Sequence, residues 1–92
     1  MARQFIYDDD SYDVLAEAEV GWREADGALH GKGPQAVRHV GRDGLVIVAR
    51  VPGNGWLVLG FVELRTEMWL LTEVRRLTGE ESDAMDAMFG GR

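Results

Sequence analysis

Arginine side chains are the groups in this 92-residue sequence best suited to chemistry. Six of them fall within residues 36–78, at Arg38, Arg42, Arg50, Arg65, Arg75 and Arg76. A guanidinium group keeps its positive charge at physiological pH and binds phosphate oxygens through paired hydrogen bonds. If these side chains converge, they can hold a phosphate backbone and stabilise the negative charge of a phosphoryl transition state.

The proton acceptors available for such a reaction are few. The sequence has two histidines, His30 and His39, and His39 lies within the arginine-rich stretch. Imidazole titrates near neutral pH, so His39 is the candidate base. There is no cysteine, neither GxxxxGK[ST] nor GxGxxG occurs, and two distant histidines do not make a metal site. We therefore expect no metal and no cofactor.

The arginines also have a simpler explanation. They can be solubilising charges at strand ends, paired with Glu63, Glu67 and Glu73. Because side chains alternate across a strand, one of Arg75 and Arg76 must point to each face of the sheet. The sequence leaves open whether the arginines converge on one face.

Charge is unevenly distributed along the chain. The net charge is −6, yet residues 31–78 carry seven Lys or Arg against four acids. The first thirty residues carry two basic residues against eight acids, and residues 79–92 carry one against four. A basic sheet flanked by acidic ends argues against non-specific binding of nucleic acid but allows one local cationic surface.

The elements that position the arginines are predicted to be strands. Arg-Asp-Gly at 42–44 and Pro-Gly-Asn-Gly at 52–55 favour tight turns, because Gly and Asn tolerate the positive φ of hairpins. The segments between them are rich in β-branched and other apolar residues. We predict a four-stranded antiparallel meander with strands at 36–41, 44–51, 56–65 and 68–77. Residues 4–7 are a short apolar run, predicted as an edge strand or an ordered arm.

Helices are predicted on both sides of the meander. Aspartates 8–10 favour a helix start, and apolar residues at 3–4 spacing predict helices at 11–20 and 22–30, with Gly21 ending the first. One continuous helix that includes Gly21 is the alternative. Trp22 lies on that stripe, and we expect it to fill the core under the sheet. Thr78 and Glu81 match a capping box, which predicts a helix over 79–89 that buries its apolar residues, Ala84, Met85, Met88 and Phe89.

The fold class that follows is α+β, with two short N-terminal helices, a four-stranded antiparallel meander and a short C-terminal helix. The chain is predicted to be a single domain, 1–92. Neither a transmembrane run nor a secretory signal is recognisable, so we expect a cytoplasmic protein without membrane contact.

The apolar pattern of one predicted strand indicates a protein partner. Residues 56–64 are apolar at both odd and even positions, whereas an antiparallel strand with one solvated face should alternate. Either the C-terminal helix closes this second face, or a partner does. An uncovered apolar face usually marks a protein–protein interface, either with another protein or with a second copy of the chain. The predicted interface consists of Trp56, Val58, Val62, Leu64 and Trp69.

Three short stretches together resemble the RelE/ParE-like toxins, in particular their BrnT-like branch. They are residues 20–29, with the pattern GW-x-EA-x-x-AL, residues 40–44 (VGRDG), and residues 72–81 (TEVRRLTGEE), which cover about a third of the chain. The resemblance implies a ribonuclease with Arg75 at its RNA-cleaving surface and Arg50 nearby. From the residue types themselves, His39 is then the candidate base, and Arg38, Arg42, Arg65 and Arg76 are candidates for contacts with RNA. It also implies a bacterial or phage origin and inhibition by a cognate antitoxin. Glu19 stands where the family has a helix histidine, and this chain is acidic where the family is basic.

Two functions follow from these observations. The first is a small non-catalytic interaction module, an acidic regulator or inhibitor that binds a protein partner or itself through the apolar sheet face. The alternative is a toxin-type endoribonuclease that uses Arg75, Arg50 and His39.

Overall fold

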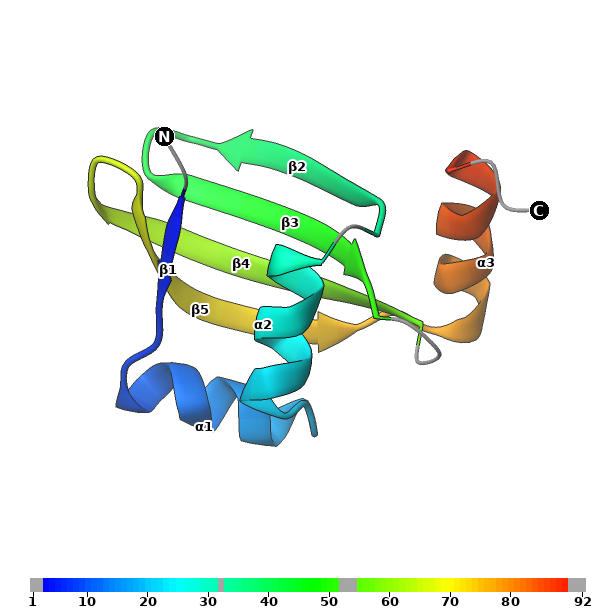
Figure 1. Cartoon of the computed structure of the whole chain (residues 1–92), viewed down its shortest axis with the longest axis horizontal. Coiled ribbons are helices and arrows are strands. Elements are labelled where there is room, and N and C mark those ends of the chain that lie inside the picture. Colours follow the sequence, from blue (N-terminus) through cyan, green and yellow to red (C-terminus); the bar gives the residue numbers. More distant parts are fainter. Residues whose placement is uncertain (1–2, 32, 52–54, 90–92) are drawn as a thin grey trace.

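The computed structural model describes residues 3–31, 33–51 and 55–89. The elements follow in the order β1 (Gln4–Ile6), α1 (Asp9–Glu17), α2 (Trp22–His30), β2 (Gln35–Val40), β3 (Gly44–Arg50), β4 (Trp56–Arg65), β5 (Met68–Arg76) and α3 (Gly79–Met88). Figure 1 shows α2 lying over one face of the sheet and α1 alongside its β5 edge, while α3 stands at one end of the sheet.

The sheet has five strands in the order β1-β5-β4-β3-β2, and β1 runs parallel to β5. The predicted four-stranded antiparallel sheet is therefore wrong, because the sheet is mixed. Gln4 donates its backbone N–H to the Glu67 carbonyl at 2.8 Å, which starts the parallel pairing. The ring centroids of Phe5 and Phe61 are 4.9 Å apart. The contact between these two aromatic rings stabilises the pairing of β1 with β5. The sequence of a three-residue strand does not predict such a contact.

Cross-strand register decides which residues share a face. Leu45 lies opposite Phe61, and Ile47 lies opposite Leu59. Directly opposed side chains point to the same side. Together with residues of α1 and α2, these side chains form the core, whose members include Leu15, Ala25, Leu29, Leu45, Ile47, Leu57, Leu59, Phe61, Trp69 and Leu71.

We call the other side of the sheet the open face, because neither α1 nor α2 covers it. Its register positions are Arg38, Val46, Val48, Arg50, Trp56, Val58, Gly60, Val62, Glu73 and Arg75. Val46, Val48, Val58 and Val62 are half-buried, whereas Leu45, Ile47, Leu57 and Leu59 on the other side of the same strands are fully buried.

The first helix begins at a capping box. The Asp8 side chain accepts the Ser11 backbone N–H, and the Ser11 hydroxyl accepts the Asp8 N–H. Ser11 is fully buried, and its hydroxyl also donates to the Leu71 carbonyl at 2.6 Å. This bond fastens α1 to the edge of β5 just beyond the end of β1.

Trp22 does not fill the core, so that prediction was wrong. Helix α1 ends at Glu17, and Glu19 has a left-handed backbone with φ of 58°. The turn at Glu19 breaks the apolar stripe and starts α2 at a new rotation. Trp22 is consequently 46% exposed, with the Arg23 guanidinium 5.6 Å from its ring centroid. Gly21 is the N-cap of α2 and not the end of α1.

Two turns fall within the described residues of the meander. Gly41 has φ of 62° and starts the turn between β2 and β3, one residue before the predicted Arg-Asp-Gly. The turn between β4 and β5 uses Glu67 at φ of 63°. The predicted turn at 52–55 lies outside the described residues except for Gly55, which has φ of 78°.

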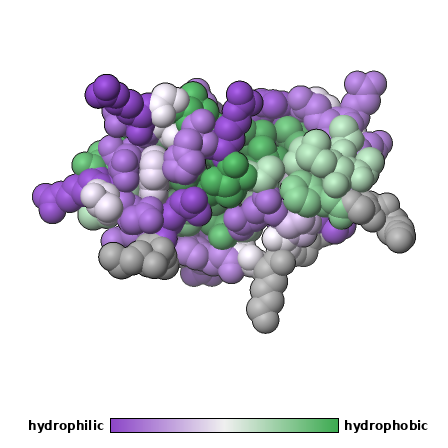
Figure 2. Space-filling model, turned by 90° about the horizontal axis from the view of Figure 1, so that it is seen from above, coloured by the Kyte–Doolittle hydropathy of each residue, from purple (hydrophilic) through white to green (hydrophobic). Residues whose placement is uncertain are grey.

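Helix α3 has the predicted capping box but not the predicted burial. The Thr78 hydroxyl accepts the Glu81 N–H, and the Glu81 carboxylate accepts the Thr78 N–H. No residue of α3 is buried: Ala84, Met88 and Phe89 are exposed, and Met85 is half-buried. In Figure 2, pale green atoms gather at the end of the molecule where α3 stands. Across the described ranges, no helix is long and apolar enough to cross a membrane.

Candidate phosphate-binding face

Three of the predicted arginines lie on the open face, each from a different strand. Arg38 of β2 is opposite Val46, Arg50 of β3 is opposite Trp56, and Arg75 of β5 is opposite Val58. All three are exposed. From β3 to β5 is two strand spacings, so the backbones of Arg50 and Arg75 lie about 10 Å apart across the sheet and about 7 Å apart along it.

A carboxylate lies on the same face, and a glycine makes room for it. Glu73 is directly opposite Gly60 in the register. A Cβ at Gly60 would come within 3.1 Å of both Cβ and Oε1 of Glu73, which shows that the Glu73 side chain lies over the glycine. Glu73 and Arg75 are two residues apart on one strand and point to the same side. The sequence analysis did not select Glu73 as a site residue; the signal available was Gly60 in the middle of an otherwise apolar strand.

Both side chains border a groove of about 460 Å³ at the edge of the sheet. It forms because β1 pairs only with Met68–Leu70, which leaves the later part of β5 beside α1. The lining residues are Val14, Glu17, Val58, Thr72, Glu73, Val74 and Arg75. A ligand on the open face near Arg75 can therefore extend around this edge of the sheet.

Arg75 is held by the start of α3. Its Nη1 donates to Glu81 Oε1 at 2.9 Å, and the same oxygen accepts the Thr78 backbone N–H at 2.9 Å. The hydrogen bond from Arg75, followed by that from Thr78, lowers the pKa of the Glu81 carboxyl below its usual value. The contact uses one of the five N–H donors of the guanidinium group.

Arg76 points to the opposite side, as strand alternation requires. Its guanidinium donates to both carboxylate oxygens of Glu24, at 3.1 and 3.2 Å, and to the Glu19 carbonyl at 3.4 Å. The two side chains are 31% and 21% exposed. Arg76 therefore fastens the end of β5 to α2 and does not lie on the face that carries Arg75.

The remaining predicted cationic residues lie elsewhere. Arg42 is in the turn after β2 and Arg65 is at the end of β4, at the opposite end of the sheet from Arg50 and Arg75. His39 is paired with Leu45, so it points to the side that carries α1 and α2. Its ring centroid is 6.0 Å from that of Trp69. The structure does not bring His39 together with Arg50 and Arg75.

The predicted apolar interface is covered in part by the chain itself. Trp69 is 3% exposed and belongs to the core. Trp56 is 1% exposed: its indole N–H donates to Asp86 at 2.9 Å, and its ring stacks on Phe89. Val58 and Val62 are half-buried, and Leu64 is 53% exposed. The two aromatic residues that would anchor a partner are thus engaged within the molecule.

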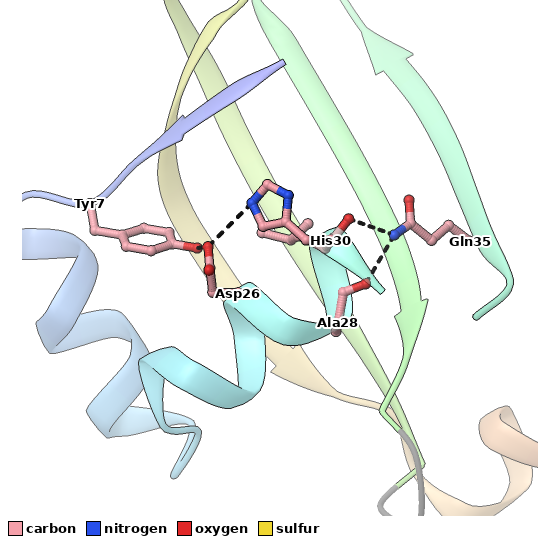
Figure 3. A network of polar contacts seen from close by, with 6 residues as sticks. Tyr7, Asp26, Ala28, His30 and Gln35 are labelled. Carbon is pink, nitrogen blue, oxygen red and sulfur yellow. Dashed lines mark hydrogen bonds and ion pairs between the residues drawn. The ribbon is translucent and has the colours of Figure 1, made fainter. Parts of the chain in front are cut away.

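A polar network that the sequence analysis did not anticipate lies on the helical side (Figure 3). The Tyr7 hydroxyl donates to Asp26 Oδ1 at 3.0 Å, and His30 Nε2 is 3.5 Å from the same oxygen. Gln35 donates to the carbonyls of Ala28 and Leu29 at the end of α2. Burial and the bond to Asp26 raise the pKa of Tyr7 well above its usual value. The network joins the segment after β1 to α2, and α2 to β2.

The fold and this face define a small mixed-sheet α+β protein, in which the open face carries Arg38, Arg50 and Arg75 and the opposite side packs against α2. Its structure is similar to the crystal structure of the Brucella abortus ribonuclease toxin BrnT. The two superpose with a TM-score of 0.61 at 14% sequence identity, over 84% of this chain and 99% of BrnT. The similarity is one of fold. No protein-family model matches the sequence, and neither does any curated protein.

Proposed function

We propose that this chain is a ribonuclease toxin of the BrnT kind and that it cleaves single-stranded RNA on the open face. The observation that carries the proposal is that Glu73 and Arg75 lie on the same strand and line the same groove, in a fold similar to that of a ribonuclease toxin. Metal-independent RNA cleavage needs a proton acceptor and a cation near the phosphate, and a carboxylate and a guanidinium group can fill these two roles.

In the proposed reaction the 2′-hydroxyl of a ribose attacks the adjacent phosphorus atom. Glu73 accepts the hydroxyl proton, and the new O–P bond forms as the bond from phosphorus to the 5′-oxygen breaks. Arg75 stabilises the negative charge on the phosphoryl oxygens, and Arg50 binds a neighbouring phosphate. The leaving 5′-oxygen takes a proton from water, which gives a 2′,3′-cyclic phosphate and a 5′-hydroxyl. Glu73 thus replaces His39, which faces the other side of the sheet.

The test is cleavage of a short unstructured RNA by the purified protein. Loss of a general base lowers the rate by about 10²–10⁴-fold, so Glu73→Gln should be nearly inactive. Arg75→Ala should lose about 10²–10³-fold, in line with removal of a preorganised donor to the transition state. Arg65→Ala is the matched control, because it removes an equally exposed arginine from the far end of the sheet.

Growth of cells that express the chain is an independent measurement. Induction of the wild-type protein should arrest growth, and Arg75→Ala should relieve the arrest. Unimpaired growth at high expression, together with intact RNA in vitro, would contradict the proposal. We further propose that a cognate antitoxin inhibits the protein, and co-expression with the neighbouring gene followed by size-exclusion chromatography would detect such a complex.

A further inference from the structure

We propose that Phe89, stacked on Trp56, is a platform for one unpaired base of the bound RNA. The inference rests on the proposed function and adds a base-binding subsite next to the arginines. Its ligand is a single-stranded nucleobase, whatever its sequence, because every base presents a π-face.

The geometry of the two rings carries the inference. Their centroids are 5.4 Å apart and the ring planes differ by 22°, so the rings are stacked. Trp56 is 1% exposed and fixed by its hydrogen bond to Asp86. Phe89 covers Trp56 yet remains 40% exposed. A planar group arriving from solvent can therefore stack on the outer side of Phe89 and extend an existing aromatic pair.

The position of the pair beside the arginines favours RNA as the occupant. Arg50 lies directly opposite Trp56, and Arg75 is opposite Val58, two residues further along β4. A stacked base needs a cation within reach of the phosphates on either side of it. Of the four carboxylates of α3, Glu81 is bonded to Arg75 and Asp86 to the Trp56 indole N–H.

A base on Phe89 would also help to choose the bond that is cleaved. Stacking fixes one nucleotide relative to the sheet, and the phosphate that reaches Arg75 is then set by the length of chain between them. The platform is expected to affect both the affinity for RNA and the position of cleavage.

The experiment measures binding of a fluorescent single-stranded RNA at one fixed salt concentration. The RNA carries 2′-O-methyl groups, which prevent cleavage. Stacking of one base is worth about 1–3 kcal/mol, so Phe89→Leu should weaken binding by about 5- to 150-fold. Phe89→Trp retains a ring and should bind within about twofold of wild type. Met88→Leu is the matched control, because Met88 is 71% exposed and precedes Phe89.

A second measurement avoids any question about folding of the variants. A set of RNAs, each with one abasic position, is bound to the wild-type protein, and one position should lose affinity to the same extent as Phe89→Leu. On that abasic RNA the Phe89→Leu substitution should have no further effect.

The outcomes separate this inference from the proposed function. Binding that depends on Arg75 but is unchanged by Phe89→Leu and by every abasic position overturns the platform alone. Absence of RNA binding by the wild-type protein overturns the proposed function and the platform with it. A change in oligomeric mass with Phe89→Leu, at unchanged RNA affinity, would assign the exposed ring to a protein contact and also overturn the platform.

Discussion

Arg75 and Glu81 form an ion pair through a carboxylate oxygen that also caps a helix. Glu81 Oε1 accepts Arg75 Nη1 and the Thr78 backbone N–H, each at 2.9 Å. The first turn of α3 and the principal cation of the open face are therefore joined at one atom. A phosphate that binds Arg75 must share the guanidinium group with this carboxylate.

Glu81→Gln separates these two roles. Glutamine still accepts the Thr78 N–H at the third position of a capping box, so α3 should form as before. Removing the charge should raise the RNA affinity and the cleavage rate by about two- to fivefold, the scale of an exposed ion pair. Glu80→Gln removes the same charge from the same turn without a contact to Arg75, and it should change both quantities less. Equal effects of the two substitutions would show that net charge, and not the ion pair with Arg75, controls RNA binding and cleavage.

Gly60→Ala tests the position of the Glu73 carboxylate without altering its chemistry. The new methyl group would lie 3.1 Å from Glu73 Cβ and Oε1, so the Glu73 side chain must move. We expect cleavage to fall by about tenfold or more, since a base displaced from hydrogen-bonding distance loses most of its effect. Gly27→Ala is the control: a Cβ there meets nothing within 4 Å, and the substitution lies within α2. It should raise stability by about 0.5–1 kcal/mol and leave cleavage unchanged.

Arg76→Ala should destabilise the fold, whereas the neighbouring Arg75→Ala should not. Arg76 makes two hydrogen bonds to the half-buried Glu24 carboxylate, which its loss leaves without these donors. Hydrogen bonds to charged groups contribute about 1–3 kcal/mol, and we expect a loss of that size in urea unfolding. Arg75 pairs with an exposed carboxylate, so its removal should change stability much less than removal of Arg76. Equal losses for the two variants would contradict the placement of these residues on opposite faces.

We expect the protein to lose stability at alkaline pH because of the raised pKa of Tyr7. Burial and the hydrogen bond to Asp26 raise its pKa in the folded state above the unfolded value of about 10. A raised pKa means that the neutral form is favoured by folding, so this contribution is complete below about pH 10 and is lost as the pH rises further. Thermal unfolding from pH 8 to 11 should show the decline, and Tyr7→Phe should reduce its slope. Tyr12→Phe is the control, because Tyr12 is 47% exposed.

Local features of the fold followed from short-range chemistry. Thr78 and Glu81 form the capping box that their spacing predicts, and Asp8 accepts the first N–H groups of α1. Arg75 and Arg76 point to opposite faces because alternation along a strand permits nothing else. These outcomes depend on residues within about four positions of each other.

The errors share a different cause. The pairing of β1 with β5 joins residues more than sixty positions apart. A run of three residues is too short to show a periodicity from which this pairing could be predicted. Trp22 has helical spacing to Leu15 and Ala25, but the left-handed residue Glu19 resets the rotation between the helices. Glu73 as a site residue depends on the register that sets it over Gly60, and a shift by one residue would turn it to the other face.

Spacing along the chain was enough to predict the three helical segments, the capping of α3 and the alternation of Arg75 and Arg76, because backbone sterics and nearby hydrogen bonds act within a few residues. It placed the turn after β2 at residues 42–44, whereas the turn starts at Gly41. Only the tertiary structure decided that Arg50, Glu73 and Arg75 share an open face, that His39 is excluded from it, and that Phe89 covers Trp56. Those relationships are fixed by strand register and by packing between distant segments, and no local pattern encodes them.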